Sequence, residues 1–369
     1  MRLFGPLDAV LALLFAYIGT RLLAPLPPAG MWAGVAFLAV LFLLLPRSWW
    51  TRDDGRLWKA MLPWLATGFF SWLLVLTVVR DLGLLAAAWL DPAALGEWTR
   101  ITALAVLGAT PAITLAGFLM ARQVAAVKRV EVRVENLPEP LEGFTIAQIT
   151  DIHVGPTIKG DFVRRIVERV NSLGADMVAI TGDLVDGSVR DLAPHTAPLA
   201  DLRSRHGTYV VTGNHEYYSG AKSWIAELRR LGTHVLVNEH VVLEHGGARI
   251  AVAGVTDYSA HRFHPEHRSD ARRALHGAPA DAIKVLLAHQ PRSAPHAQAA
   301  GADLQISGHT HGGQFWPWNL FVRLQQPFTA GLHRLGSMWI YISRGTGYWG
   351  PPMRFGIPSE ITRIRLVRD

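Results

Sequence analysis

The stretch Gln148-Ile149-Thr150-Asp151-Ile152-His153 decides the fold of this chain. It ends a mostly apolar run, Thr145 to Thr150, which predicts a short buried strand. The run stops at an acid and an imidazole two positions apart. Asp151 and His153 are therefore expected on the loop that leaves the strand.

Four later segments repeat this arrangement of a short β-type run followed by polar residues. They are Gly182-Asp183, Gly213-Asn214-His215-Glu216, His289 and Gly308-His309-Thr310-His311. In an open α/β sheet, ligands bind outside the carboxyl ends of the strands, so residues far apart in sequence can converge there. The convergent set contains two Asp, one Asn and five His, which is the composition of a site for two metal ions.

The composition divides the 369 residues into two parts. The first 121 residues are dominated by Leu, Ala, Val, Phe and Trp, whereas the remainder has an ordinary globular mixture. The absence of cysteine excludes disulfides and thiolate zinc sites, and it is compatible with an oxidising or a reducing compartment. The net charge of +7 fits a nucleic-acid binder or a protein that faces anionic lipid. We favour the membrane, because apolar segments are present and no long Lys/Arg tract is.

Four apolar segments lie in residues 1–121: Leu7 to Leu23, Met31 to Leu45, Met61 to Val79 and Thr102 to Met120. A bilayer-spanning helix needs roughly 17–25 mostly apolar residues, which the third and fourth segments supply and the second barely reaches. The first segment resembles a signal peptide, but no clear cleavage site follows it and three more apolar segments do. We expect an uncleaved region of about four transmembrane helices.

The basic residues predict the orientation of these helices. With four spans, one side carries Arg2, Arg47, Arg52, Arg56, Lys59, Arg122, Lys128 and Arg129, and the other carries only Arg21, Arg80 and Arg100. The positive-inside bias then places the C-terminal part in the cytoplasm, attached to the inner (plasma) membrane as a multi-pass protein. An odd number of spans would place it on the opposite side.

A second domain is expected from residue 127 to residue 369. It opens with alternation at Val130, Val132 and Val134, which predicts a half-buried strand. Helices are expected from Asp161, as an N-cap, to Leu173, and from Ser223 to Leu231. Strands are expected at Met177–Thr181, Tyr209–Thr212, Arg249–Gly254, Lys284–Ala288 and Asp303–Ser307. Strands that alternate with helices predict a layered α/β domain.

The five polar blocks, in this order, resemble the signature of the calcineurin-like metallophosphoesterases. One block alone is weak, whereas five in order at strand exits are specific. The resemblance covers roughly Val127 to Asp369. It is closest to the membrane-associated bacterial branch, because of residues 308–314, Ser343-Arg344-Gly345-Thr346-Gly347 and Pro358-Ser359-Glu360-Ile361. The family implies an α/β fold, a layered β-sandwich flanked by helices, here preceded by an all-α transmembrane region.

The resemblance implies two divalent metal ions, Mn, Fe, Zn or Co, with the choice among them left open. One would be held by Asp151, His153, Asp183 and His311, and the other by Asp183, Asn214, His289 and His309. The residue types suit this role, because a carboxylate can bridge two cations, imidazoles bind these metals, and an Asn oxygen adds no charge. In the family, such a pair acidifies a shared water and clamps the attacking and leaving oxygens at phosphorus.

The resemblance gives His215 a role apart from the metals. In the family this position protonates the leaving group or stabilises the charge that builds on it, a general-acid role for an imidazole poised near neutral pH. A lone His289 would more often be structural, but it follows the buried run Val285 to Ala288. Asp186 and Asp257 are candidates to support the metal ligands, with helix-capping or turn roles equally open.

Two arginines and an aromatic cluster are candidates for contacts with the substrate or the bilayer. Arg344 and Arg354 are candidates for phosphate binding, because a guanidinium matches phosphate oxygens, with plain surface charge as the competing reading. An aromatic cluster follows the last metal ligands. We hypothesise that it forms an apolar lip that meets the bilayer or an acyl chain, against ordinary packing as the alternative. Its members are Phe315, Trp316, Trp318, Phe321 and Phe328.

These features together predict a membrane-anchored, two-metal phosphohydrolase that cleaves a phosphodiester or pyrophosphate. A lipid-linked substrate, such as a glycerophospholipid or a UDP-diacylglucosamine-type precursor, is the leading expectation. A nucleotide phosphodiesterase or nuclease is the alternative, disfavoured because no aromatic and basic strip for single strands is present. A non-catalytic metal-binding module is disfavoured because every expected position is filled. Monoester or diester preference and oligomeric state stay open.

Overall fold

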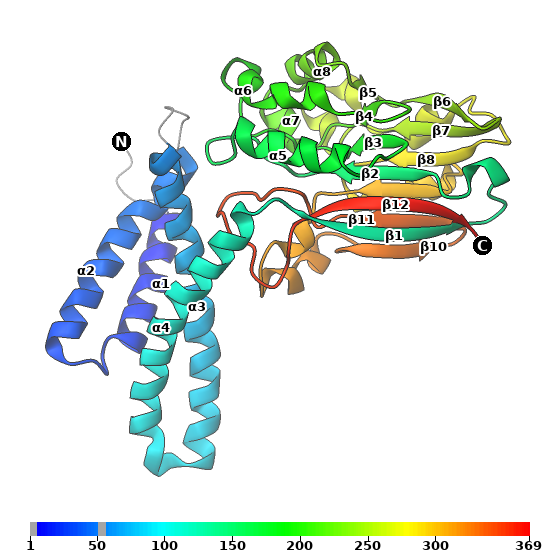
Figure 1. Cartoon of the computed structure of the whole chain (residues 1–369). Coiled ribbons are helices and arrows are strands. Elements are labelled where there is room, and N and C mark those ends of the chain that lie inside the picture. The colour runs from blue at the N-terminus through cyan, green and yellow to red at the C-terminus, as the bar shows by residue number, and fades with distance from the viewer. Residues whose placement is uncertain (1–5, 51–56) are drawn as a thin grey trace. The chain divides into compact units, whose positions relative to one another are not determined.

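The computed structural model describes residues 6–50 and 57–369. It divides the chain into two compact units (Figure 1). The helical unit comprises Met1–Met120 and Gly350–Met353. The second unit comprises Ala121–Trp349 and Arg354–Asp369, and we name it the catalytic unit after the activity that the sequence predicts. Arg2, Arg52 and Arg56, which the orientation argument uses, lie outside the described residues.

Among the residues that the structure describes, the helical unit contains four α-helices, of which three are candidates to span a membrane. The helices are α1 (Pro6–Leu22), α2 (Pro28–Leu44), α3 (Leu57–Leu90) and α4 (Leu95–Arg122). Within the described residues, the stretches long and apolar enough to cross a bilayer are Pro28–Ser48, Leu57–Leu90 and Pro92–Arg122. The protein is therefore a membrane protein by length and composition of its helices. The 17-residue helix α1 is not among these candidates, although four spans were predicted.

A polar network ties α1, α3 and α4 together. Arg80 is buried within α3 and donates to Asp81 Oδ1 at 2.8 Å and to Thr102 Oγ1 at 3.1 Å. Asp81 Oδ2 accepts from Tyr17 Oη at 2.8 Å and from Arg21 Nε at 2.7 Å. Helix α3 continues past Val79 to Leu90, so Arg80 lies inside a helix and not in the loop that the sequence predicted.

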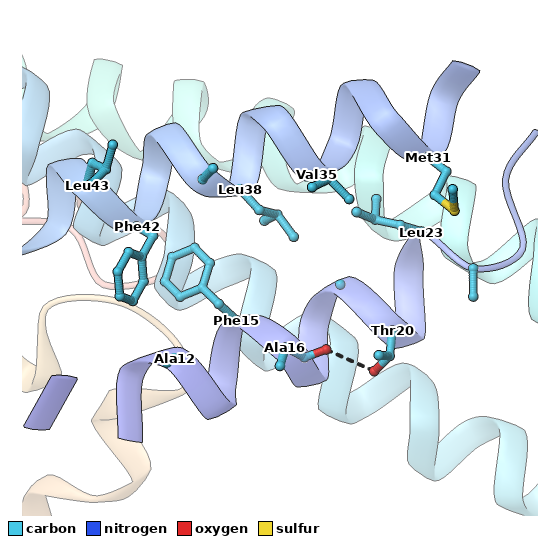
Figure 2. A pocket seen from close by; sticks show the side chains of 13 residues that line it. Ala12, Phe15, Ala16, Thr20, Leu23, Met31, Val35, Leu38, Phe42 and Leu43 are labelled. Atoms are coloured by element: carbon cyan, nitrogen blue, oxygen red, sulfur yellow. Dashed lines mark hydrogen bonds between the residues drawn. The ribbon is translucent and has the colours of Figure 1, made fainter. Parts of the chain in front are cut away.

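An apolar pocket lies between α1 and α2 (Figure 2). Its volume is about 730 Å³, and Phe15, Leu38 and Phe42 are among the residues that line it. The Thr20 hydroxyl donates to the Ala16 carbonyl at 2.9 Å, within its own helix. The pocket therefore presents almost only hydrocarbon, which suits a segment that lies in lipid.

The catalytic unit contains two six-stranded sheets. The first has the order β1-β12-β2-β3-β4-β5, and the second has the order β10-β11-β9-β8-β7-β6. The strands are β1 (Ala126–Val134), β2 (Thr145–Ile149), β3 (Met177–Ile180), β4 (Thr208–Val210), β5 (His234–Val235), β6 (Glu239–His245), β7 (Ala248–Gly254), β8 (Ile283–Leu287), β9 (Leu304–Ser307), β10 (Gly331–Leu335), β11 (Met338–Ile342) and β12 (Glu360–Arg368).

Strand β12 lies between β1 and β2, although it follows all other strands in the chain. It runs parallel to β1 and antiparallel to β2, so Ile364 is opposite Val130 on one side and Ile146 on the other. Strands β2, β3 and β4 are parallel neighbours, as are β7, β8 and β9. Their carboxyl ends therefore meet at a shared edge of each sheet.

The two sheets face each other across an apolar core, and helices cover their outer faces (Figure 1). This core includes Ile146 and Tyr209 from the first sheet and Val252 and Ile306 from the second. Helices α5 (Gly160–Asn171), α6 (Val189–Thr196) and α8 (Ala221–Arg230) pack on the first sheet, and α9 (Ala271–Leu275) and α10 (Ala294–Ala299) on the second. The predicted class, a layered β-sandwich flanked by helices, is confirmed.

Helix α5 forms because its apolar side chains recur at helical spacing. Phe162, Ile166 and Val170 are buried against the first sheet. The prediction that Asp161 caps this helix is wrong, because the helix begins at Gly160 with Lys159 in the N-cap position. Asp161 lies in the first turn, where a carboxylate still interacts favourably with the helix dipole.

Candidate metal centre

The predicted polar residues lie on loops at the carboxyl ends of neighbouring strands. Asp151 and His153 follow β2, Asp183 follows β3, and Asn214 begins the short helix α7 (Asn214–Tyr218) after β4. In the second sheet, His289 follows β8, and His309 and His311 follow β9. Because β2–β4 and β8–β9 are parallel neighbours, their loops converge.

The backbone at these loops adopts an unusual conformation. Five of the predicted ligand residues have left-handed φ angles: Asp151 at 54°, His153 at 56°, Asp183 at 51°, His309 at 72° and His311 at 50°. A non-glycine residue in this region costs on the order of 1–3 kcal/mol and persists only when the surrounding structure enforces it. The repeated conformation indicates that the loops are held to aim side chains at one point.

Glycines in the motifs let the loops approach closely. A methyl group on Gly213 would lie 2.1 Å from Asp183 Oδ1, and one on Gly308 would lie 2.3 Å from Asp151 Oδ2. Both distances are far below van der Waals contact. Gly213 and Gly308 are therefore each required by the carboxylate against which they pack.

Asp151, His153 and His311 form the first group of potential ligands. His153 Nε2 lies 3.0 Å from His311 Nε2, and His311 Nε2 lies 3.5 Å from Asp151 Oδ1. All three side chains are buried. Three donor atoms thus point at one small volume.

Asp183, His289 and His309 form the second group. His289 Nε2 lies 3.0 Å from Asp183 Oδ2 and 3.1 Å from His309 Nδ1. Asp183 Oδ2 is also 4.0 Å from His153 Nε2 of the first group. This carboxylate therefore lies between the two groups.

The outer hydrogen bonds of two imidazoles determine which nitrogen faces the centre. His289 Nδ1 lies 2.8 Å from the Thr181 carbonyl oxygen, which can only accept, so Nδ1 carries a proton. His153 Nδ1 contacts Asp186 Oδ1 at 2.9 Å in the same way. When these rings are neutral, each Nε2 presents a lone pair toward Asp183, and a cation between the ring and the carboxylate would be bound by both. Metal-ligating histidines characteristically have such outer partners.

Asn214 provides an independent indication of a cation. Its side-chain oxygen is buried and has no hydrogen-bond partner among the described residues. An unsatisfied buried amide oxygen costs about 1–3 kcal/mol, and a metal ion is an acceptor's natural partner. Carboxylate, imidazole and amide donors of this kind fit Mn, Fe, Zn or Co.

His215 lies beside the two groups and is held by Asp186. Its Nδ1 contacts Asp186 Oδ1 at 2.6 Å, and its Nε2 lies 4.0 Å from Asp183 Oδ2. Burial lowers the pKa of His215, but the hydrogen bond to Asp186 and the charges of nearby carboxylates outweigh this effect and raise the pKa to about 9. The imidazole is therefore able to carry a proton at neutral pH.

Two carboxylates support the loops without facing the centre. Asp186, a candidate supporting residue, contacts both His153 and His215 through one oxygen. Glu216 accepts from the backbone N–H groups of Gly213, Asp183 and Leu184 at 2.6, 3.0 and 2.7 Å. No role was predicted for Glu216 from the sequence. Its position three residues after Gly213, at the start of a helix, is the pattern that could have indicated a capping role.

The other proposed supporting residue, Asp257, is buried away from the ligands. It accepts from Ser259 N at 2.8 Å and from Gln290 Nε2 at 2.9 Å. The first hydrogen bond closes a local turn, and the second holds Gln290, the residue after His289. Asp257 therefore has a turn role and also supports the loop that carries His289.

The two candidate arginines occupy different environments. Arg344 is partly exposed, and its side chain packs on Gly312 of the last metal loop. Arg354 is fully buried and donates to the carbonyls of His311 at 3.0 Å, Arg344 at 2.8 Å and Gly347 at 3.1 Å. Its guanidinium also lies 3.0 Å from His311 Nδ1. These contacts occupy Arg354 within the fold, so we revise the expected phosphate contact at Arg354 to a role in positioning His311.

Replacing Arg354 tests that role. Arg354→Met removes the side-chain donor to the carbonyls of Arg344 and Gly347, and each orphaned acceptor is expected to cost about 1–3 kcal/mol. The His311 carbonyl keeps the Gln314 N–H as a donor. We expect a lowered midpoint of thermal unfolding and weaker metal binding in the detergent-purified protein. Arg249→Met removes an exposed ion pair with Asp281 and should change stability by less than about 1 kcal/mol. Equal effects of the two substitutions would contradict the positioning role.

Comparisons with known proteins place this site in a family. The family model described as calcineurin-like phosphoesterase matches residues 144–313. The chain is 40% identical over 295 residues to "Transmembrane protein with metallophosphoesterase domain" of Bos taurus, which covers 76% of this chain and 66% of the relative. It is 41% identical over 243 residues to an uncharacterized metallophosphoesterase of Helicobacter pylori strain J99, covering 65% of this chain and 64% of the relative.

The chain thus spans just under two thirds of the length of these relatives. An uncharacterized metallophosphoesterase of Aquifex aeolicus is matched almost completely, with 32% identity over 245 residues, 65% of this chain and 91% of the relative. All five polar blocks lie within residues 144–313, the part that the family model matches. This chain belongs to the calcineurin-like metallophosphoesterases.

Proposed function

We propose that the protein is a membrane-anchored phosphohydrolase that uses two divalent metal ions to cleave phosphodiester or pyrophosphate bonds. The convergence of two ligand groups on Asp183 carries this proposal. Asp151, His153, Asp183 and His311 would hold one ion, and Asp183, Asn214, His289 and His309 the other. Such ions, when bound, supply Lewis-acid chemistry at phosphorus and lower the pKa of bound water.

The chain's own residues account for the other requirements of the reaction. The Nε2 atom of His215 is the one left facing the substrate side, because Nδ1 is held by Asp186. We propose that His215 donates its proton to the leaving oxygen. Asp186 keeps the ring in the orientation from which Nε2 can donate, so it acts as a positioning residue.

Arg344 remains our proposed phosphate contact. Its side chain is partly exposed beside Gly312, one residue from His311. A guanidinium can bind two phosphate oxygens at once, which would orient the substrate before cleavage. Glu360 Oε2 lies 4.0 Å from Arg344 Nε and holds the side chain at the site's edge.

We propose a lipid-linked substrate, because the helices of this chain confine its catalytic unit to the surface of a membrane. A nucleotide phosphodiesterase is the second candidate, since the metal ligands alone do not determine which alcohols are esterified to the phosphate of the substrate. A vesicle-embedded glycerophospholipid and a soluble dinucleotide, offered at equal phosphodiester concentration, distinguish the two. Faster cleavage of the dinucleotide would favour the second candidate.

Loss of the acid or the bridging carboxylate should abolish turnover. With Mn²⁺ supplied, we expect nitrophenol release from bis-p-nitrophenyl phosphate, and removal of a general acid in His215→Ala should lower kcat by roughly 10²–10⁴-fold. Asp183→Asn should also be inactive. Asp186→Asn should lower kcat with little change in KM. The exposed residues His276 and Asp281 supply matched controls, His276→Ala and Asp281→Asn. Metal-loaded protein without any hydrolysis would refute the proposed activity.

Metal stoichiometry tests the two-ion assignment separately from activity. We expect two Mn²⁺ ions per chain by isothermal titration and elemental analysis. Asn214→Ala should weaken the binding of one ion and leave the affinity for the other unchanged, because Asn214 belongs to only one of the two proposed ligand sets. Asp183→Asn should weaken the binding of both ions. A single ion in the unaltered protein would contradict the assignment.

We propose that the catalytic unit lies in the cytoplasm, because the basic residues Arg47 and Arg122 share its side of the membrane whether three or four helices span. The absence of native cysteine makes accessibility measurable with single introduced cysteines. Gly96→Cys, near the start of α4, should react with a membrane-impermeant maleimide on intact spheroplasts. His276→Cys in the catalytic unit should react only after lysis. Labelling of His276→Cys before lysis would reverse the orientation.

A further inference from the structure

One segment of the catalytic unit exposes an unusual amount of apolar surface. The apolar segment, as we call residues Trp316–Leu324, presents Leu320 with 61%, Phe321 with 52% and Leu324 with 82% of its surface exposed. Trp316 and Trp318 are 38% and 43% exposed. Soluble proteins rarely expose contiguous apolar patches of this kind unless they bind a partner or a membrane.

The aromatic cluster predicted from the sequence divides into packed and exposed members. Phe315 is buried, and Phe328 packs against the core beneath the second sheet. Between them the chain turns outward in two short 3₁₀ helices, Trp318–Leu320 and Val322–Leu324. Ordinary packing therefore explains the two outer members of the aromatic cluster, Phe315 and Phe328, but not the exposed residues between them.

The base of the apolar segment is fixed to residues beside the metal ligands. A methyl group on Gly313 would lie 2.2 Å from Asn319 Cα, so the segment packs directly on the loop of His311. At its other end, Gln326 Nε2 donates to Gln290 Oε1 at 3.3 Å, next to His289. The exposed side chains thus project from the surroundings of the site.

The apolar segment itself carries charge of one sign. No Asp or Glu occurs from Leu304 to Ser359. Of the four arginines in this stretch, Arg354 is buried, and Arg334 and Arg344 lie beside Glu135 and Glu360. Arg323, within the apolar segment, is exposed. Cationic and apolar surface together complement an anionic lipid headgroup region.

We propose that the apolar segment inserts into the headgroup and acyl boundary of the bilayer that holds α2, α3 and α4. Trp, Phe and Leu with a neighbouring Arg are the side chains that enter this zone. The insertion brings the metal loops to the lipid surface, so a phosphoester in a headgroup reaches them without leaving the bilayer. This consequence rests on the proposed function, whereas the insertion itself does not require hydrolysis.

Depth-dependent quenching tests the insertion directly. Leu324→Cys and Val242→Cys, each the single cysteine of the full chain, are labelled with an environment-sensitive NBD probe. Val242 is 40% exposed on β6 and serves as the matched control. Each protein is placed as one copy per nanodisc of phosphatidylcholine and phosphatidylglycerol. We expect nitroxide lipid to quench the Leu324 probe several-fold more than the Val242 probe, and aqueous iodide to show the reverse order.

Each other outcome overturns the proposal. Iodide quenching of the Leu324 probe equal to that of Val242 means that the apolar segment faces water. Protection from both quenchers means that it is covered by protein, from a second copy or another partner. Neither reading depends on turnover, so an inactive protein refutes the proposed activity and leaves this result intact.

The combined substitution Leu320→Ser, Phe321→Ser and Leu324→Ser adds a functional readout. It should lower cleavage of a vesicle-embedded phosphodiester at least several-fold and leave cleavage of bis-p-nitrophenyl phosphate unchanged. Equal loss on both substrates would show that the apolar segment supports the site's structure and not its contact with lipid.

Discussion

The structure depends on holding two buried carboxylates, Asp151 and Asp183, beside a group of imidazoles. Removing a carboxylate from water costs several kcal/mol unless positive charge or hydrogen-bond donors compensate it. The compensating groups come from loops of both sheets, so no single element can form the centre alone. Left-handed backbone at five ligand residues and glycines without room for a methyl group both follow from this requirement.

The supporting residues show how one carboxylate serves two tasks. Asp186 contacts the metal-facing His153 and the proposed acid His215 through the same oxygen atom. Burial raises the pKa of Asp186, but these two imidazoles outweigh it and hold the pKa below its ordinary value. The proposed acid and the proposed metal ligand are therefore coupled through one carboxylate. Glu216 plays the corresponding role for the backbone by joining the loops after β3 and β4.

The sequence predicted those parts of the molecule that have a local signature. Apolar runs that end in polar residues predicted β2, β3, β4, β8 and β9, and helical spacing predicted α5 and α8. Strands β5, β6, β10, β11 and β12 were missed. The place of β12 depends on its distant partners β1 and β2, whereas β10 and β11 form a local hairpin whose pattern was not recognised. Arg354 was predicted to bind the substrate phosphate, because the sequence shows that the side chain is charged but not that it is buried. Asp81 was overlooked because α3 extends beyond its most apolar stretch.

The placement of β12 has a consequence for how the protein is made. Ribosomes deliver the helices first and residues 360–368 after every other strand, yet those residues fill the gap between β1 and β2. Until they emerge, both neighbours present open strand edges, which readily pair with other chains. The metal loop that leaves β2 is likewise unsupported during this interval. Newly synthesised chains therefore carry an unfinished first sheet until residues 360–368 have left the ribosome.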